Sequence, residues 1–254
     1  MDFELSAIGI SALLIAGFIA GFINTLAGGG SMLTLPALMM MGMPADIANA
    51  TNRVGVFLQS LTAAKSFNKY ERLDKKAILP MMLPTLVGSL LGSLLASYLP
   101  VWILKPTLLI CMMTMALVML AIPNLLLPEE GTAPKRINDE PLGLFMLFIA
   151  GVYGGFVQAG VGFILLAALA GVLRYDLVRA NALKMVATAS FGGVALAVFV
   201  IRGQVMWVPG LILAVGTMTG AALSVKFALN VSQTTLKWLL FIMVSITCAS
   251  ALLM

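Results

Sequence analysis

The chain has 254 residues, of which 61% are hydrophobic and only 10% are charged. About a quarter of the residues in a soluble domain are charged, so this composition excludes a soluble protein and indicates an integral membrane protein. The net charge of +5 would suit nucleic acid, but the bases cluster in loops beside apolar runs. Membrane topology explains them better, so no nucleic-acid partner is expected.

The apolar runs are continuous rather than alternating, which indicates membrane-spanning helices and not barrel strands. Five of them lie at about 6–26, 31–42, 47–66, 77–98 and 102–122. The polar stretch PNLLLPEEGTAPKRINDEP, residues 123–141, follows as a linker. Five more lie at about 142–158, 161–173, 177–201, 206–227 and 232–253.

The two groups of five share four sequence blocks in the same order. AGFIAGF (16–22) matches AGVYGGF (150–156), and Gly28, Gly30 and Leu33 match Gly160, Gly162 and Leu165. ANATNRV (48–54) then matches ANALKMV (180–186), and VGSLLG (87–92) matches VGTMTG (215–220). This order predicts an internal duplication, with a first membrane repeat at 1–122, the linker at 123–141 and a second repeat at 142–254.

The positive charges indicate how often each repeat crosses the membrane. If every segment crosses, ten bases lie in cytoplasmic loops and two lie outside, whereas the split is eight to four if the short second segments dip in and return. The positive-inside rule favours the first arrangement, with the N-terminus outside. An odd number of crossings makes the repeats inverted, as in many secondary transporters. The predicted fold is therefore all-α, with about ten transmembrane segments as two inverted five-helix repeats and short broken helices at their interface.

The stretch LAGGGSMLTLPAL (26–38) interrupts an apolar run with Gly28, Gly29 and Gly30. A broken helix points backbone N–H groups and the positive end of its dipole at an anion, and Ser31 could cap the short helix that follows. The second copy keeps Gly160 and Gly162 but has phenylalanine in place of the serine, so the half-sites are expected to be unequal. A tight turn between packed helices is the alternative interpretation. Glycine pairs at a spacing of four elsewhere predict close helix packing, at Gly17 and Gly21, Gly88 and Gly92, Gly151 and Gly155, and Gly216 and Gly220.

Polar residues cluster within the third segment of each half. Asn49, Asn52 and Arg53 share one helix face, and Asn181 and Lys184 share another with Thr188. A charge within a span costs on the order of 3 kcal/mol, which makes the two bases candidates for a functional site, although both could instead extend to an interface. All ten carboxylates lie at segment ends, in loops or in the linker, so the interior should favour anions over cations. With no histidine and two cysteines in apolar runs, no metal site and no cofactor are expected.

The blocks GFINTLAGGGSMLTLPAL and ANATNRV, with their weaker copies GGFVQAGVGFILLAAL and ANALKMV, resemble the sulfite exporter TauE/SafE family over essentially the whole chain. The resemblance implies a permease for small sulfur-containing or organic anions in a prokaryotic plasma membrane. The two motif regions of the family map onto 24–31 with 49–53, and onto 158–162 with 181–184.

The resulting hypothesis is a secondary transporter that moves a small anion, such as sulfite or a sulfonate, by alternating access. A membrane scaffold without a solute pathway is the alternative, and an enzyme within the bilayer is disfavoured, although Ser31 and Lys184 could form a dyad. The expected partners are the anion and the lipid bilayer, while a homo-oligomer, the coupling ion and the direction of transport stay open. The candidate substrate-binding residues are Asn24, Gly28, Gly29, Gly30, Ser31, Asn49, Asn52, Arg53, Gln158, Gly160, Gly162, Asn181 and Lys184.

Overall fold

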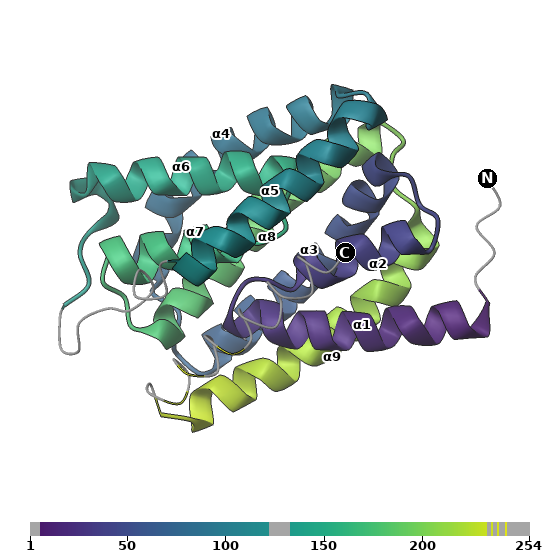
Figure 1. Cartoon of the computed structure of the whole chain (residues 1–254). Helices are drawn as coiled ribbons and strands as arrows, with labels where there is room; N and C mark the ends of the chain where they lie inside the picture. Colours follow the sequence, from purple (N-terminus) through teal and green to yellow (C-terminus); the bar gives the residue numbers. More distant parts are fainter. Residues whose placement is uncertain (1–5, 122–132, 233–234, 236–237, 239–241, 243–254) are drawn as a thin grey trace.

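Helices form all the regular structure in the part of the chain that this computed structural model describes, which is residues 6–121, 133–232, 235, 238 and 242 (Figure 1). In chain order they are α1 (Ala7–Leu26), α2 (Ser31–Met40), α3 (Ala45–Lys69), α4 (Lys75–Tyr98), α5 (Val101–Ala121), the short turn η2 (Ile137–Asp139), α6 (Pro141–Phe156), α7 (Val161–Leu166), η3 (Ala167–Val172), α8 (Leu177–Ile201) and α9 (Trp207–Asn230). η3 continues α7 as a π-helix. These ranges agree with the expected segments. Residues 123–132 of the expected linker, and most of the tenth segment at 232–253, lie outside the described residues.

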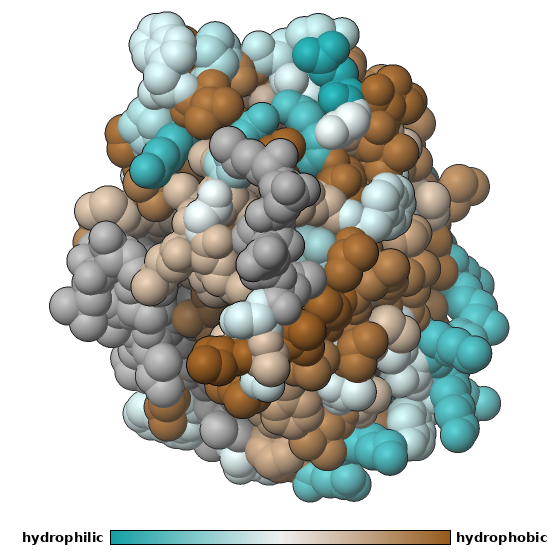
Figure 2. All heavy atoms as spheres, turned by 90° about the vertical axis from the view of Figure 1, so that its right-hand side faces the viewer, coloured by the Kyte–Doolittle hydropathy of each residue, from teal (hydrophilic) through white to brown (hydrophobic). Residues whose placement is uncertain are grey.

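Four of the described helices, α1, α4, α8 and α9, are long and apolar enough to cross a membrane. α2 has ten residues, and at about 1.5 Å per residue its length is roughly half of the ~30 Å hydrocarbon core. Apolar side chains cover much of the molecular face in Figure 2, and hydrophilic ones gather at its top and lower right. The all-helical membrane class is confirmed, whereas about ten crossings stays a prediction.

A seam of glycines joins α1 to α9. A Cβ atom on Gly17 would lie 2.8 Å from the Leu213 carbonyl oxygen, and one on Gly21 would clash with the Thr217 carbonyl. Only glycine therefore lets these two backbones touch. The contacts advance along both helices together, so α1 and α9 run in the same direction.

A second seam joins α4 to α6 in the same way. A Cβ atom on Gly88 would clash with the Phe148 carbonyl, and one on Gly92 would clash with the Val152 carbonyl. These helices are also parallel to each other. The close helix packing expected from the glycine pairs is confirmed, and each seam joins one helix from before the linker to one from after it.

α3 lies alongside α9 and follows its direction. The Met206 N–H donates to Thr51 Oγ1 over 3.0 Å, and further along Thr217 Oγ1 donates to the Gly55 carbonyl over 3.0 Å. α1, α3 and α9 are therefore parallel. Because α1 and α3 share a direction, residues 27–44, which include α2, carry the chain back between them (Figure 1).

α8 lies alongside α4 in the corresponding manner. Ser89 Oγ donates to the Phe191 carbonyl over 2.7 Å, and Gln204 Nε2 donates to the Ser97 carbonyl over 3.4 Å. α4, α6 and α8 are thus parallel to one another. They run opposite to α1, α3 and α9, since α3 and α4 form a hairpin around residues 70–74 (Figure 1).

Candidate functional site

The two helix breaks meet at one junction inside the protein. α1 ends at Leu26 before its glycines, and α6 ends at Phe156 before the second break. Gly28 and Gly160 hold left-handed backbone angles, with φ of +94° and +84°. A Cβ atom on Gly28 would lie 2.5 Å from the Cα of Gly162, so the two breaks are in backbone contact. Position 28 therefore requires glycine both for its conformation and for this close approach.

The start of α2 differs from the expectation in one respect. Ser31 is the first residue of the helix and not its cap, because Gly30 has a helical backbone and its carbonyl accepts the Leu33 and Thr34 N–H groups. The prediction of a serine cap is therefore wrong. Among the described residues, no backbone acceptor binds the N–H groups of Gly29, Gly30 or Ser31. The buried start of α2 thus has amide donors beside the junction that lack a backbone acceptor in the described part of the chain.

Arg53 is fully buried on α3 and reaches across to the end of α6. Its Nη1 donates to the Gly154 carbonyl over 2.7 Å, and its Nη2 donates to the carbonyls of Gly155 over 2.6 Å and Phe156 over 3.2 Å. Asn49, one turn before, donates from Nδ2 to the Phe156 carbonyl over 2.9 Å. These are carbonyls that α6 itself cannot satisfy, and they carry the negative end of its dipole.

Lys184 is fully buried on α8 and makes the corresponding contact with the end of α1. Its Nζ donates to the carbonyls of Asn24 over 2.9 Å and Thr25 over 3.0 Å. It also donates to Asn181 Oδ1 over 2.6 Å. Each base therefore caps the broken helix of the other half. Neither side chain extends to the surface, so the alternative of an interfacial position is wrong.

Several polar atoms at this junction are buried without a hydrogen-bond partner among the described residues. They are Arg53 Nε, Asn181 Nδ2 and both side-chain polar atoms of Gln158. Gln158 is 1% exposed and has a φ of 66°, a left-handed conformation that is unusual for a residue with a side chain. An unpaired buried donor costs about 1–3 kcal/mol, and such donors can bind a group that accepts hydrogen bonds.

Two predicted site residues have supporting roles here. Asn52 Oδ1 accepts from Thr34 Oγ1 over 2.6 Å, which fixes α2 to α3. Asn24 contributes its backbone carbonyl to Lys184, as described above.

The sequence interpretation missed three residues around the junction. The Tyr153 hydroxyl donates to the Ala159 carbonyl over 2.8 Å and anchors the second break. Its sequence signal is a phenol within an otherwise apolar segment. Phe199 lies 4.8 Å from the Arg53 guanidinium carbon, measured to the ring centre, but one phenylalanine among 13 gives no signal. Gly192 is buried on α8, yet a Cβ atom there would have no described atom within 4 Å, so open space lies beside it.

Broken helices whose ends meet around buried charges, within a helical membrane protein, are typical of secondary transporters. The chain belongs to the sulfite exporter TauE/SafE family, which matches residues 13–251. It is therefore a member of a family of membrane transporters and not an enzyme.

The curated relatives cover nearly the whole chain. A "probable membrane transporter protein" of Haemophilus influenzae is 30% identical over 234 residues, 92% of this chain and 91% of the relative. The "probable membrane transporter protein YfcA" of Escherichia coli K12 is 30% identical over 255 residues, 98% of this chain and 92% of the relative. No solved structure matches the chain.

Proposed function

We propose that this protein is a secondary transporter for a small anion, of the sulfite, sulfonate or organic-acid class, which works by alternating access in the plasma membrane of a prokaryote. The observation that carries the proposal is the pair of fully buried bases, Arg53 and Lys184, which have no carboxylate partner among the described residues. The family assignment favours this function over the scaffold alternative, and sulfite itself follows from the family description.

The charge balance at the junction favours an anion. In its protonated form each base carries one positive charge, and each helix end offers about half a negative charge in return. About half a positive charge per base is left in a region that excludes water, where an uncompensated charge is costly. An anion that binds between the two bases supplies the missing charge. No acidic side chain among the described residues lies at the junction to bind a cation.

The unpaired donors define how the anion is bound in this proposal. Arg53 Nε, Asn181 Nδ2 and the Gln158 amide donate to its oxygen atoms, and the free amides at the start of α2 add backbone donors. The open space beside Gly192, on the same face of α8 as Asn181, forms part of the path. An oxyanion suits a site built from several donors better than a halide ion does.

The helix directions support two inverted halves. α1 and α3 run one way, α6 and α8 run the other way, and each first helix packs in parallel against the fourth helix of the other half. The return of the chain through α2 and through α7 fits the topology in which every segment crosses. We therefore assign the first repeat to residues 1–122, the linker to 123–141 and the second repeat to 142–254, with the N-terminus outside.

Anion flux into vesicles of neutral lipid tests the function directly. The purified full-length chain should transport sulfite or a sulfonate, and these anions should raise its unfolding temperature while choline does not. Arg53→Gln and Lys184→Gln should each reduce flux at least a hundredfold, because an uncharged amide cannot replace the lost positive charge. Arg202→Gln is the matched control, since this exposed base stacks on Tyr98 at 4.2 Å, away from the junction. Wild-type flux in both site variants would remove Arg53 and Lys184 from the site, and the absence of flux and of any response to anions in the wild type would support the scaffold alternative.

A substitution at Gln158 separates ligand binding from stability. Gln158→Gly removes the unpaired amide and relieves the left-handed backbone, so we expect the protein to gain about 1 kcal/mol of stability. If the amide binds the anion, affinity should fall about tenfold in the same variant. Arg174→Gly is the control, because exposed Arg174 has a similar φ of 62° and is not among the site residues. A stabilised variant with unchanged affinity would remove Gln158 from the site.

A further inference from the structure

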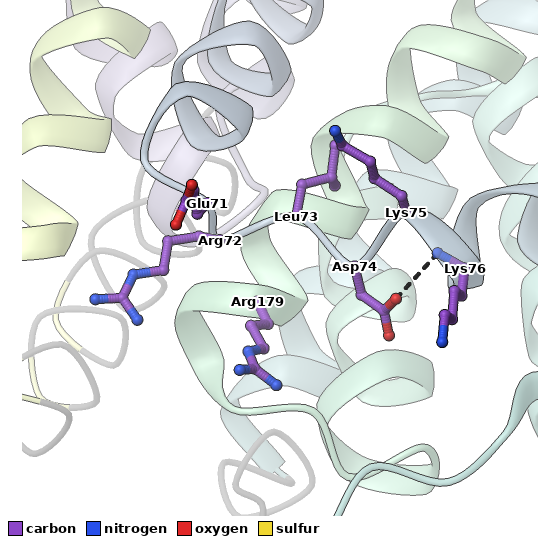
Figure 3. A pocket seen from close by; sticks show the side chains of 7 residues that line it. All are labelled: Glu71, Arg72, Leu73, Asp74, Lys75, Lys76 and Arg179. Atoms are coloured by element: carbon purple, nitrogen blue, oxygen red, sulfur yellow. Dashed lines mark hydrogen bonds between the residues drawn. The ribbon is translucent and has the colours of Figure 1, made fainter.

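A charged cavity lies at the C-terminal end of α3, where the hairpin between α3 and α4 meets the start of α8 (Figure 3). Its volume is about 500 Å³, within the usual range for a small-ligand site. The residues that line it are Glu71, Arg72, Leu73, Asp74, Lys75, Lys76 and Arg179. We call this cavity the basic basin. Its bases belong to the group that the positive-inside rule assigns to the cytoplasm.

The basin has an excess of free positive charge. Its two acids face four bases, and one acid, Asp74, is already engaged. Asp74 Oδ1 accepts from the Lys76 N–H over 3.0 Å, and Oδ2 accepts from the Tyr175 hydroxyl over 3.1 Å. Arg179 makes a loose ion pair with Asp176 at 3.4 Å, but the side chains of Arg72, Lys75 and Lys76 have no ion pair among the described residues.

The basic side chains of the basin come from separate parts of the chain and are oriented as Figure 3 shows. In Figure 3 the side chains of Arg72, Arg179 and Lys76 extend toward the lower part of the view, whereas Lys75 extends upward. Arg72 comes from the loop before α4, and Arg179 comes from α8, beyond the linker. A second cavity of about 370 Å³ shares Asp74 and Lys76 with the basin and adds Lys135 and Arg136. Asp139 also lines this second cavity, and Lys135 forms an ion pair with Glu140 over 2.6 Å, so its excess of positive charge is smaller than that of the basin.

We propose that the basic basin binds a phosphate group, carried either by the headgroup of an anionic phospholipid or by a free phosphate ester. Arginine presents a planar set of donors that matches phosphate oxygens, and basic pockets on the cytoplasmic side of membrane proteins bind anionic headgroups. This site is separate from the junction of the helix breaks, so it stands or falls independently of the proposed transport function.

Binding of phosphatidylglycerol to the purified full-length chain tests the proposal, with native mass spectrometry as the readout and zwitterionic phosphatidylcholine, whose choline cation balances its phosphate, as the comparison without net charge. The double variant Arg72→Gln/Arg179→Gln should bind phosphatidylglycerol about thirtyfold more weakly, since two basic contacts to an anionic headgroup are lost. The matched control is Lys65→Gln/Lys69→Gln, which removes the same charge from exposed positions on α3 outside the basin. The control should bind as the wild type does.

Glycerol 3-phosphate distinguishes the two sources of the phosphate. If it competes with phosphatidylglycerol at similar concentrations, the basin recognises the phosphate ester itself, and if it does not compete, the intact lipid is the ligand. Equal weakening in both double variants would show general surface electrostatics and overturn the proposal. Equal binding of phosphatidylglycerol and phosphatidylcholine would overturn it as well. Because all four bases are exposed, we expect unchanged unfolding temperatures in both variants.

Discussion

Substitution of Gly28 by alanine tests whether the two helix breaks touch. The new Cβ atom would lie 2.5 Å from the Cα of Gly162 and 3.1 Å from the Phe163 nitrogen, and both are backbone atoms that cannot move independently. The φ of +94° adds conformational strain of about 1–2 kcal/mol for any residue with a Cβ. Forced overlap in a packed interior adds about 1–3 kcal/mol. We therefore expect Gly28→Ala to destabilise the protein by about 2–5 kcal/mol.

Gly42 provides the matched control for this prediction. Its φ of +92° is nearly the same, but a Cβ atom there would have no described atom within 4 Å. Gly42→Ala should therefore show only the conformational term, about 1–2 kcal/mol. For a chain of this size the unfolding temperature changes by roughly 2–4 °C per kcal/mol, so thermal unfolding in detergent resolves the difference. Equal changes in the two variants would refute the contact between the breaks.

Two further predictions concern the helix seams and the loop beside the basic basin. Gly92→Ala should destabilise the protein by about 1–3 kcal/mol because its Cβ atom meets the Val152 carbonyl. Gly192→Ala should instead stabilise the protein by about 0.5–1 kcal/mol, because its Cβ atom has no described atom within 4 Å and alanine favours a helix over glycine. Thermal unfolding of both variants checks the opposite signs. Burial and the negative charge of Asp74 raise the pKa of Tyr175 from 10 to about 12. The hydrogen bond from the Tyr175 hydroxyl to Asp74 should therefore contribute fully to the stability of the protein below pH 10, and this contribution should be lost between pH 10 and 12. Tyr175→Phe should lower the unfolding temperature at pH 8 and lose less stability than the wild type between pH 10 and 12; parallel pH profiles in the two proteins would contradict this.

Local sequence patterns were sufficient to predict the helix segments and the close packing at the glycine pairs. The length of an apolar segment and the regular spacing of glycines are properties of a single helix. Both can therefore be recognised in the sequence without knowing which helix packs against it. Which glycines face each other could not be predicted. Gly21 could pack on any helix with a small face, and only the three-dimensional arrangement brings it to Thr217.

The structure brings several of the candidate residues together, but the contacts between them were not predicted. The i, i+3 and i+4 spacing correctly placed Asn181 and Lys184 on one face, and their hydrogen bond follows from it. The bond from Lys184 to Asn24 spans 160 positions, and no local pattern carries such a contact. The prediction of a serine cap was wrong because a run of glycines does not show at which residue the helix begins, and the helix starts at Ser31 itself. Gln158 was proposed from the repeat, but its strained backbone is visible only in the structure.

The two caps are not equivalent, and this has a consequence for the proposed mechanism. In the aligned blocks ANATNRV and ANALKMV, Lys184 corresponds to Asn52, and Arg53 corresponds to a methionine. Arg53 holds three carbonyls of α6 with its planar fork, whereas Lys184 holds two carbonyls of α1. Two identical inverted halves would give inward-open and outward-open states of equal energy. Because the caps differ, the two states of the proposed alternating-access mechanism should differ in energy, and the proposed anion would shift this balance only by as much as its affinities for the two states differ.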